Sequence, residues 1–392
     1  MVELLAPAGD LEKLKIAVLY GANAVFIGGL KFSLRSRASN FTIEDIAEGC
    51  RFAHEHGAQV HVTCNIVMHE IDTDDILEYL KALEGAGVDA VIASSITILK
   101  LVKEHTTMEA HVSTQTSTIN LEAVNFFKDL GVDRVVLGRE LSLEEIKYIR
   151  ENTDIDLEVF IHGGMCVSYS GRCMLSNNMT NRDANRGGCA HSCRWNYDLY
   201  CNEELINPEG DYFAMSSKDL CAISVIPELM KMGINSFKIE GRMKSLHYIA
   251  TIVKAYRTII DDVYNNTLKD NEYYETMIAK AENRLTSTGF LKGLPTIKEQ
   301  LYDLNLTLPS KDFVGIVLEY DKETKKVTIE QRNYFLPNSN LEVFGPNHNE
   351  IIKIGEVFDK DGISLDAARH PRQIVHIYSD YPFEVNDLIR LA

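Results

Sequence analysis

The sequence predicts an α/β fold: a (β/α)8 barrel of the TIM type with a cysteine-rich insertion after its seventh strand, followed by a small antiparallel β-barrel. Short runs rich in Val and Ile alternate with helical-period stretches from residue 2 to about residue 242, which is typical of strand–helix units with a parallel sheet. Beyond residue 310 the pattern changes to short strands joined by Gly, Asn, Asp and Pro turns, as in a small antiparallel barrel. A doubly wound open sheet is the alternative for the first part, because a count of strands does not reveal closure.

Eight barrel strands are expected, and helices fit between the first seven of them. The strands are expected at residues 3–6, 24–27, 60–64, 90–93, 109–113, 134–137, 157–161 and 236–239. The spacing of apolar residues predicts helices at 11–20, 42–56, 73–86, 95–104, 120–130 and 142–152. A longer amphipathic helix at 245–265 should close the barrel. The later strands are expected at 313–320, 326–331, 341–344, 352–358, 373–378 and 387–391.

The chain length allows one domain of barrel size and a smaller second one. We expect the barrel domain over residues 1–300, the insertion at about 162–235, and the small β-barrel over 310–392. Segments that follow barrel strands emerge at the carboxyl end of the barrel, where active sites are built. The insertion is therefore expected at this end, which we call the mouth.

Charge and hydropathy narrow the class of protein. The formal net charge of −17 disfavours loose attraction to nucleic acid or to an anionic membrane, so any nucleic-acid contact must be local. No run of about eighteen apolar residues occurs, and the start of the chain lacks a signal-peptide pattern. We therefore expect a cytoplasmic protein without a membrane partner, in which clustered cysteines are ligands or redox groups.

Four cysteines of the insertion, Cys166, Cys173, Cys189 and Cys193, are candidate metal ligands. They are separated by six, fifteen and three residues, and such a set can supply the sulfur shell of an iron–sulfur cluster or of structural zinc. The irregular spacing favours the cluster, because zinc sites usually pair close cysteines on both sides. Burial of Cys166 and Cys173 as small apolar residues is the alternative. Cys221 is a fifth candidate that could replace Cys193.

Arginines on loops after the expected strands are candidate substrate ligands. A guanidinium binds a planar carboxylate through two hydrogen bonds, so an anionic substrate with more than one carboxylate would suit this mouth. The alternative for each arginine is a local ion pair, as between Arg139 and Glu140. The predicted substrate-binding residues are Arg35, Arg37, Gln115, Arg139, Arg172 and Arg242.

Three further residues are candidates for catalysis. His162 lies directly before two glycines at the end of the seventh strand, where it is either an acid–base group or a barrel histidine with satisfied hydrogen bonds. Glu240 ends the eighth strand. Tyr169 is expected to shield the cluster or to stack on an RNA base. Phosphate-loop, nucleophile-elbow and H-E-x-x-H motifs are absent from the sequence, so nucleotide hydrolysis and common protease chemistry lose support.

Several motifs resemble those of the collagenase-like peptidase family U32. They are EVFIHGGMCVSYSGRCMLS, NRGGCAHSCRWNY, SSKDLCAI, FKIEGRMKS, SLRSRA, RELSLEEI and the opening ELLAPAGDLEKLKIAVLYGANAVFIGG. The resemblance covers the whole barrel and, more weakly, the part that follows it. Within the family the chain is most similar to members that hydroxylate tRNA.

This resemblance implies conversion of the wobble uridine of tRNA to 5-hydroxyuridine, with prephenate as the source of the hydroxyl group. It also implies a cysteine-held iron–sulfur cluster, expected to be 4Fe–4S, in which some members use the cysteine at the place of Cys221. The implied partners are tRNA, a small dicarboxylate and a second family subunit. Hydroxylation of ribosomal RNA, peptide hydrolysis and a scaffold role with a structural cluster are the alternatives.

Overall fold

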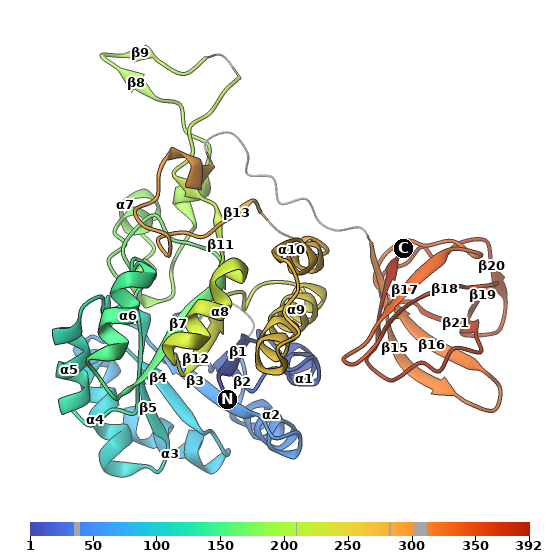
Figure 1. Cartoon of the computed structure of the whole chain (residues 1–392), viewed down its shortest axis with the longest axis horizontal. Coiled ribbons are helices and arrows are strands. Elements are labelled where there is room, and N and C mark those ends of the chain that lie inside the picture. Colours follow the sequence, from blue (N-terminus) through green and yellow to red (C-terminus); the bar gives the residue numbers. More distant parts are fainter. Residues whose placement is uncertain (35–39, 209, 282–283, 302–311) are drawn as a thin grey trace. The chain divides into compact units, whose positions relative to one another are not determined.

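A computed structural model describes residues 1–34, 40–208, 210–281, 284–301 and 312–392 (Figure 1). These residues form two compact units. The first contains Met1–Ala279 and the short segment before residue 302, and the second contains the strands from residue 313 to the end of the chain.

Eight parallel strands of the first unit close into a barrel. In chain order they are β1 (Glu3–Pro7), β2 (Ala24–Gly28), β3 (Gln59–Cys64), β4 (Ala90–Ala93), β5 (Glu109–Val112), β6 (Arg134–Val136), β7 (Asp156–Gly163) and β12 (Ser236–Ile239). Each strand pairs with the next, and β12 pairs with both β7 and β1. The predicted (β/α)8 barrel is confirmed, and the open-sheet alternative is wrong because the first and last strands share hydrogen bonds.

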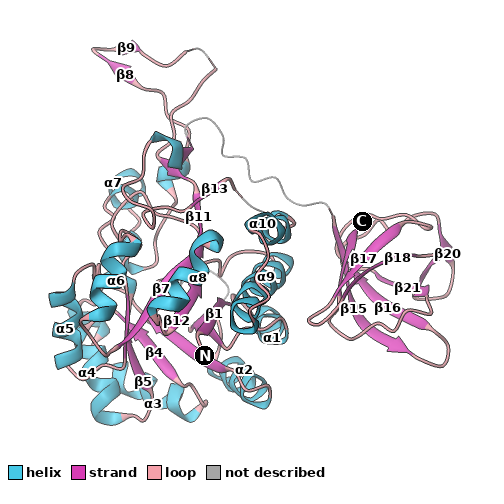
Figure 2. Cartoon of the chain, viewed as in Figure 1, coloured by secondary structure: helices cyan, strands magenta, loops and turns pink. Residues whose placement is uncertain are grey.

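Helices cover the outside of the barrel, most of them between successive strands and the last two after β12 (Figure 2). They are α1 (Leu11–Leu19), α2 (Ile43–Glu55), α3 (Ile76–Gly85), α4 (Ile96–His105), α5 (Leu121–Asp129), α6 (Leu143–Glu151), α8 (Ile226–Met232), α9 (Leu246–Asn265) and α10 (Asn271–Ala279). Side chains accept hydrogen bonds from backbone N–H groups at several helix starts, as Ser142 does before α6 and Ser245 before α9. The expected closing helix is α9, which packs against α1 and β1.

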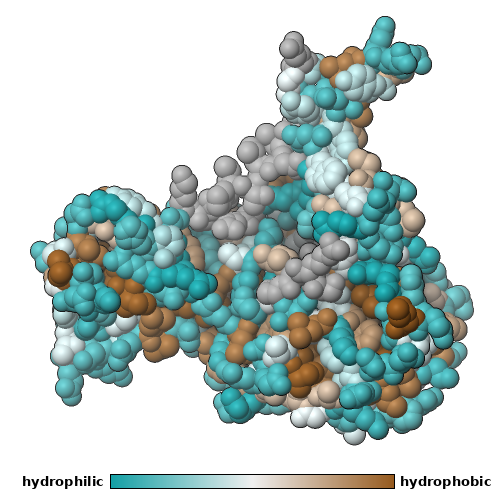
Figure 3. Space-filling view, turned by 180° about the vertical axis from the view of Figure 1, so that it is seen from behind, coloured by the Kyte–Doolittle hydropathy of each residue, from teal (hydrophilic) through white to brown (hydrophobic). Residues whose placement is uncertain are grey.

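The described ranges include no helix with both the length and the apolar character that crossing a bilayer requires. Hydrophilic residues predominate on the face of the molecule seen in Figure 3, with hydrophobic residues in separate small groups.

Buried charges of opposite sign fill the barrel near the amino ends of its strands. Lys238 Nζ lies 2.7 Å from Glu158 Oε1, and Arg134 Nη1 lies 2.5 Å from Glu3 Oε1 and 3.4 Å from Glu158 Oε2. Burial by itself would raise the pKa of Glu158, but Lys238 and Arg134 outweigh it and lower the pKa to about 2. The Glu158 carboxylate therefore stays charged. These four charged side chains stabilise the barrel only together, because loss of one would leave a buried charge without its partner.

The insertion leaves the barrel at the carboxyl end of β7 and returns to it at β12. It contains α7 (Leu175–Thr180), the hairpin of β8 (Tyr200–Cys201) and β9 (Glu204–Leu205), and the strands β10 (Ser216–Ser217) and β11 (Asp219–Cys221). Most of it is loop (Figure 2). β11 pairs antiparallel with the end of β7, so that Cys221 lies opposite His162. Two short strands of the later chain, β13 (Thr286–Ser287) and β14 (Gln300–Leu301), pair with β11 and β10.

The second unit is one antiparallel sheet curled around its own core. Its strands are β15 (Phe313–Asp321), β16 (Lys326–Gln331), β17 (Asn340–Phe344), β18 (Asn349–Lys353), β19 (Val357–Asp359), β20 (Ser364–Leu365), β21 (Ile374–Tyr378) and β22 (Leu388–Leu391). Val317, Ile329, Val343, Val375 and Ile389, from five of the strands, meet in a single apolar cluster.

The prediction of a single strand at residues 352–358 of this unit was wrong. The expected strand at 352–358 is divided between β18, which pairs with β17, and β19, which pairs with β21. The chain changes neighbours between the two strands, at residues 354–356, which a pattern of apolar residues does not reveal.

Candidate functional site

A pocket of about 340 Å³ opens at the mouth of the barrel. Residues at the carboxyl ends of the strands line one side of it, among them Asn65, Gln115, Arg139 and Glu240. The insertion supplies much of the rest. The volume suits a small organic ligand, and the position is the one at which TIM barrels carry their active sites.

The four cysteines of the insertion, Cys166, Cys173, Cys189 and Cys193, all line this pocket as free thiols. Burial raises the pKa of Cys166, the nearby thiols of Cys173 and Cys189 raise it further, and Arg139 lowers it. Burial likewise raises the pKa of Cys193, with the other three thiols adding to the effect and Arg194 opposing it. Thiolates grouped around one pocket repel one another, so a bound cation or cluster would be needed to hold all four deprotonated.

Two glycines allow the loops that carry the thiols to come close to the barrel. Gly163 ends β7 with φ +106°, and a Cβ there would lie 2.3 Å from the carbonyl oxygen of Glu240. Gly171 has φ +72°, and its Cβ would lie 2.0 Å from the carbonyl oxygen of Gln115. Any other residue would force these backbones apart. The glycines thus bring the segment from Cys166 to Cys173 against the ends of β12 and β5.

Side-chain hydrogen bonds hold the second pair of thiols near the first. Asn185 Nδ2 donates to the carbonyl oxygen of Cys173 at 3.0 Å. Ser176 Oγ, in α7, donates to the carbonyl oxygen of Gly188 at 3.3 Å and accepts from the N–H of Ala190 at 3.0 Å. The segment around Cys189 is therefore attached to the segment around Cys173.

Cys221, the expected alternative to Cys193, lies outside the residues that line the pocket. Its Sγ is 3.8 Å from the hydroxyl of Tyr256, and burial raises the pKa of its thiol. The pairing of β11 with β7 places it beside His162. The structure therefore gathers Cys193, rather than Cys221, with the other three thiols.

His162 is buried below the pocket, with 1% of its surface exposed. Its Nδ1 lies 3.2 Å from the hydroxyl of Tyr256, and its ring packs against the rings of Tyr248 and Tyr256. Burial lowers the pKa of His162 to about 3, so the imidazole is neutral near pH 7. The surroundings match those of a barrel histidine with a hydrogen-bond partner, and an acid–base role for His162 stays a prediction.

The structure brings several of the predicted substrate and catalytic residues to one pocket and separates others from it. Gln115, Arg139, Tyr169, Glu240 and Arg242 line the pocket. Arg172 is exposed outside the lining and donates from Nε to Ser117 Oγ at 3.4 Å. Arg35 and Arg37 lie outside the described residues.

The two pocket arginines have different supports. Arg242 is buried; its Nη1 donates to Ser33 Oγ at 3.0 Å and its Nη2 to Asn40 Oδ1 at 2.9 Å. The guanidinium of Arg139 stacks on the ring of Phe160, 3.9 Å from the ring centroid. Glu140, its expected local partner, accepts a hydrogen bond from the N–H of Ser170. Both guanidinium groups are thus positioned at the wall of the pocket.

Lys238 is a pocket residue that sequence reasoning missed. It lies in β12, is bonded to Glu158, and its Nζ is 4.5 Å from the centroid of the Phe26 ring. The sequence did contain a signal for Lys238, because it lies inside a short strand that was expected to be buried. A buried lysine needs an ion-pair partner or has a function.

The closed barrel, with thiols and cationic side chains around a pocket at its mouth, defines a TIM-barrel protein with a pocket where this fold carries its active sites. Residues 9–301 match the family described as Peptidase family U32, and residues 309–390 match the C-terminal domain of that family. The chain belongs to peptidase family U32.

Three relatives with assigned names are similar to this chain. It is 49% identical over 398 residues to tRNA hydroxylation protein P1 of Bacillus subtilis, covering 99% of this chain and 94% of the relative. It is 34% identical to tRNA hydroxylation protein P of Escherichia coli, covering 88% of this chain and 87% of the relative. It is 39% identical to the 23S rRNA 5-hydroxycytidine C2501 synthase of Escherichia coli, covering 67% of this chain and 40% of the relative.

Proposed function

We propose that this protein is an RNA-modifying enzyme that hydroxylates the wobble uridine of tRNA to 5-hydroxyuridine. The observation that carries the proposal is the gathering of four thiols and several cationic side chains in one pocket, in a chain 49% identical to a protein named for tRNA hydroxylation. A tRNA substrate would place the protein in the cytoplasm. The similarity to a ribosomal RNA hydroxycytidine synthase supports the same chemistry on a pyrimidine base.

Cys166, Cys173, Cys189 and Cys193 would hold an iron–sulfur cluster of the 4Fe–4S type. The irregular spacing of the four cysteines along the sequence supports a cluster over zinc, because zinc sites usually pair close cysteines on both sides. When bound, the cluster would supply electron-transfer chemistry at the mouth.

Arg139 and Arg242, with Lys238 in the same pocket lining, would bind a dicarboxylate co-substrate, for which we propose prephenate. Hydroxylation of C5 of uridine is a two-electron oxidation of the base. The co-substrate must therefore give its hydroxyl group to C5, keep the two electrons of the broken C–O bond, and take up the proton that leaves C5. Bidentate guanidinium–carboxylate bonds would fix its orientation.

Two other pocket residues, Glu240 and Tyr169, suit the removal of the C5 proton and the positioning of the uracil ring. Replacement of the C5 hydrogen by oxygen releases a proton, and the carboxylate of Glu240 lines the pocket beside Arg242. Tyr169 lines the same pocket with half of its surface exposed. Its ring is available to stack on the uracil ring, as aromatic side chains do with unpaired bases.

The test is a pair of cysteine variants in a strain that lacks the chromosomal gene and any second enzyme for this modification. Cys173→Ser should abolish bound iron, visible absorption and 5-hydroxyuridine in tRNA digests measured by mass spectrometry. Cys201→Ser is the matched control, because Cys201 is exposed on the β8–β9 hairpin and outside the pocket lining. Persistence of 5-hydroxyuridine with Cys173→Ser would refute the proposal.

Restoration of the modified nucleoside by the single wild-type gene would also distinguish an enzyme from a scaffold subunit. The same experiment would show whether a second family subunit is required.

Peptide hydrolysis is the activity that the family name suggests. It is tested by incubating anaerobically purified protein with denatured collagen. Cleavage that disappears in a His162→Gln variant would favour the peptidase over the hydroxylase.

A further inference from the structure

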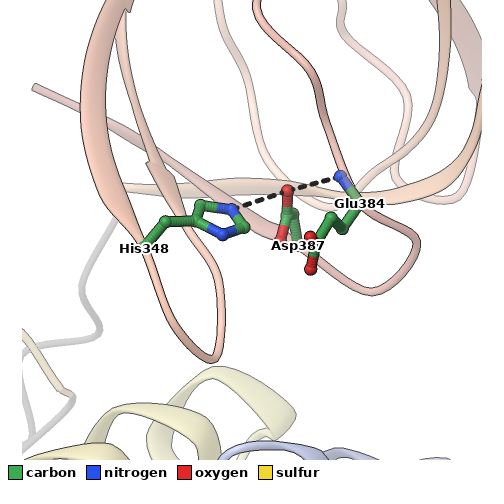
Figure 4. Close-up of side chains that lie close together, drawn as sticks. All are labelled: His348, Glu384 and Asp387. Atoms are coloured by element: carbon green, nitrogen blue, oxygen red, sulfur yellow. Dashed lines mark hydrogen bonds and ion pairs between the residues drawn. The ribbon is translucent and has the colours of Figure 1, made fainter. Parts of the chain in front are cut away.

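The second unit contains a group of three potential metal ligands far from the cysteines in sequence. His348 follows β17 in the turn to β18, and Glu384 and Asp387 lie in the turn that precedes β22. Their ligand atoms lie within 4.8 Å of one another, and Figure 4 shows the imidazole and the two carboxyl groups converging. β17 and β22 are paired neighbours, which explains why the two turns meet.

The carboxylate of Asp387 is only half satisfied. Oδ2 accepts from Nε2 of His348 at 3.0 Å and from the N–H of Glu384 at 2.8 Å. Oδ1 is buried and has no hydrogen-bond partner among the described residues, and Asp387 as a whole has no exposed surface. A buried carboxylate oxygen without a donor is costly unless a cation or a proton compensates for it. An ion pair with His348 through Oδ2 alone does not supply that compensation.

Gly345 allows the turn after β17 to lie close to the two main ligands. A Cβ on Gly345 would collide with Asp387 Oδ1 and with Cε1 and Nε2 of His348. The unpartnered Oδ1 and the edge of the imidazole that carries Nε2 are therefore neighbours, and a metal ion bound by Nε2 would replace the hydrogen bond of this nitrogen to Asp387 Oδ2. Glu384 is exposed beside them and can supply the third ligand.

We propose that His348, Glu384 and Asp387 bind a divalent transition-metal ion, with zinc as the ion that suits one imidazole and two carboxylates. The ion would join the β17–β18 turn to the turn before β22. Burial raises the pKa of Asp387, while His348 and the N–H of Glu384 oppose that shift. A cation at Oδ1 would compensate for the buried charge. The proposal does not depend on RNA hydroxylation.

The test uses the full-length protein with its cysteine site loaded with iron, titrated anaerobically with cobalt(II) as a spectroscopic substitute for zinc. The expected result is one further cobalt ion per chain. Its ligand-field absorption should appear without sulfur-to-cobalt charge transfer, and zinc should displace it. Glu384→Gln should weaken binding by about tenfold or more, and Asp387→Asn should abolish it.

One further variant makes the test specific. Glu356→Gln is the matched control, because Glu356 is an exposed acid of the same sheet unit outside the group, and it should bind as the wild type does. Glu384 is exposed, so its variant should fold even if a buried variant does not. The proposal is overturned by absence of cobalt binding, by charge-transfer absorption alone, or by unchanged affinity in the Glu384 variant.

Discussion

The two ends of the barrel interior use charged side chains in different ways. Near the amino ends of the strands, Glu3, Arg134 and Glu158 contact one another in a closed group of opposite charges. At the mouth, Arg139 and Arg242 contact an aromatic ring and neutral oxygens and line a cavity. The comparison teaches that one set stabilises the fold through mutual pairing, while the other lines a cavity, where we propose that it binds a ligand. Lys238 belongs to both sets, since it binds Glu158 and lines the pocket.

The largest expected effect is on stability, from Glu158→Ala. The change removes the partner of Lys238 and one partner of Arg134, and it leaves buried positive charge without compensation. We expect the free energy of unfolding to fall by about 3–5 kcal/mol, measured by urea denaturation. Glu151→Ala, at the exposed pair with Lys147, is the control and should change stability little. Equal losses from both variants would mean that the buried group does not stabilise the barrel.

The next effect is on ligand binding, from Arg242→Lys. An ammonium group cannot keep both the Ser33 and the Asn40 hydrogen bonds and also present a planar pair of donors to a carboxylate. Hydrogen bonds to a charged group contribute about 1.5–3 kcal/mol each. Loss of one should raise the Kd for prephenate by about 10- to 100-fold, which calorimetry would measure. Unchanged affinity together with unchanged stability would remove Arg242 from the proposed dicarboxylate site.

A smaller effect is expected from pH, through His61 and His111 of the amino end. Both are fully buried, and burial is the first cause that holds their pKa values below the usual value. Below about pH 6.5 the unfolded chain takes up protons that the folded protein does not, so the free energy of unfolding decreases as pH falls. The expected slope is up to about 1.4 kcal/mol per pH unit for each histidine.

His111→Phe should reduce this slope, because it removes one of the buried histidines whose pKa is lowered in the folded protein. It also removes a buried nitrogen, Nδ1, that has no partner among the described residues. Urea denaturation at about pH 7.5 and about pH 5.5 measures the difference. A slope identical to that of the wild type would assign the acid sensitivity to other groups.

The smallest effect is expected at Arg172. It is exposed outside the pocket lining, so Arg172→Ala should change the Kd for prephenate by less than about threefold, the difference that roughly 0.6 kcal/mol makes. Arg139→Ala is the comparison at the pocket wall and should change it more. A larger effect at Arg172 than at Arg139 would contradict the assignment of ligand binding to the pocket.

The barrel was predictable because short, largely apolar segments alternate with stretches of helical period. Ala90–Ala93 is a continuous run of Ala, Val and Ile, as expected for a strand covered on both faces. Ser236–Ile239 is less regular, since it contains Ser236 and Lys238. Closure needed the structure, since the pairing of β12 with β7 and β1 leaves no local pattern in the sequence.

The gathering of the cysteines was predictable from their density, but the separation of Cys221 from them was not. It depends on the antiparallel register of β11 against β7, which pairs two segments more than fifty residues apart in the chain. Lys238 was missed because its partner Glu158 lies in another strand. His348, Glu384 and Asp387 were missed for a similar reason, because they meet only when β17 pairs with β22.

The chain order of the barrel has a consequence for how the protein is made. β12 is the last barrel strand in chain order, and it follows all four pocket cysteines in the sequence. During translation the four thiols therefore emerge from the ribosome before the strand that closes the ring of strands. The ring is still open at that stage, so that a proposed cluster could be inserted before the ring is complete.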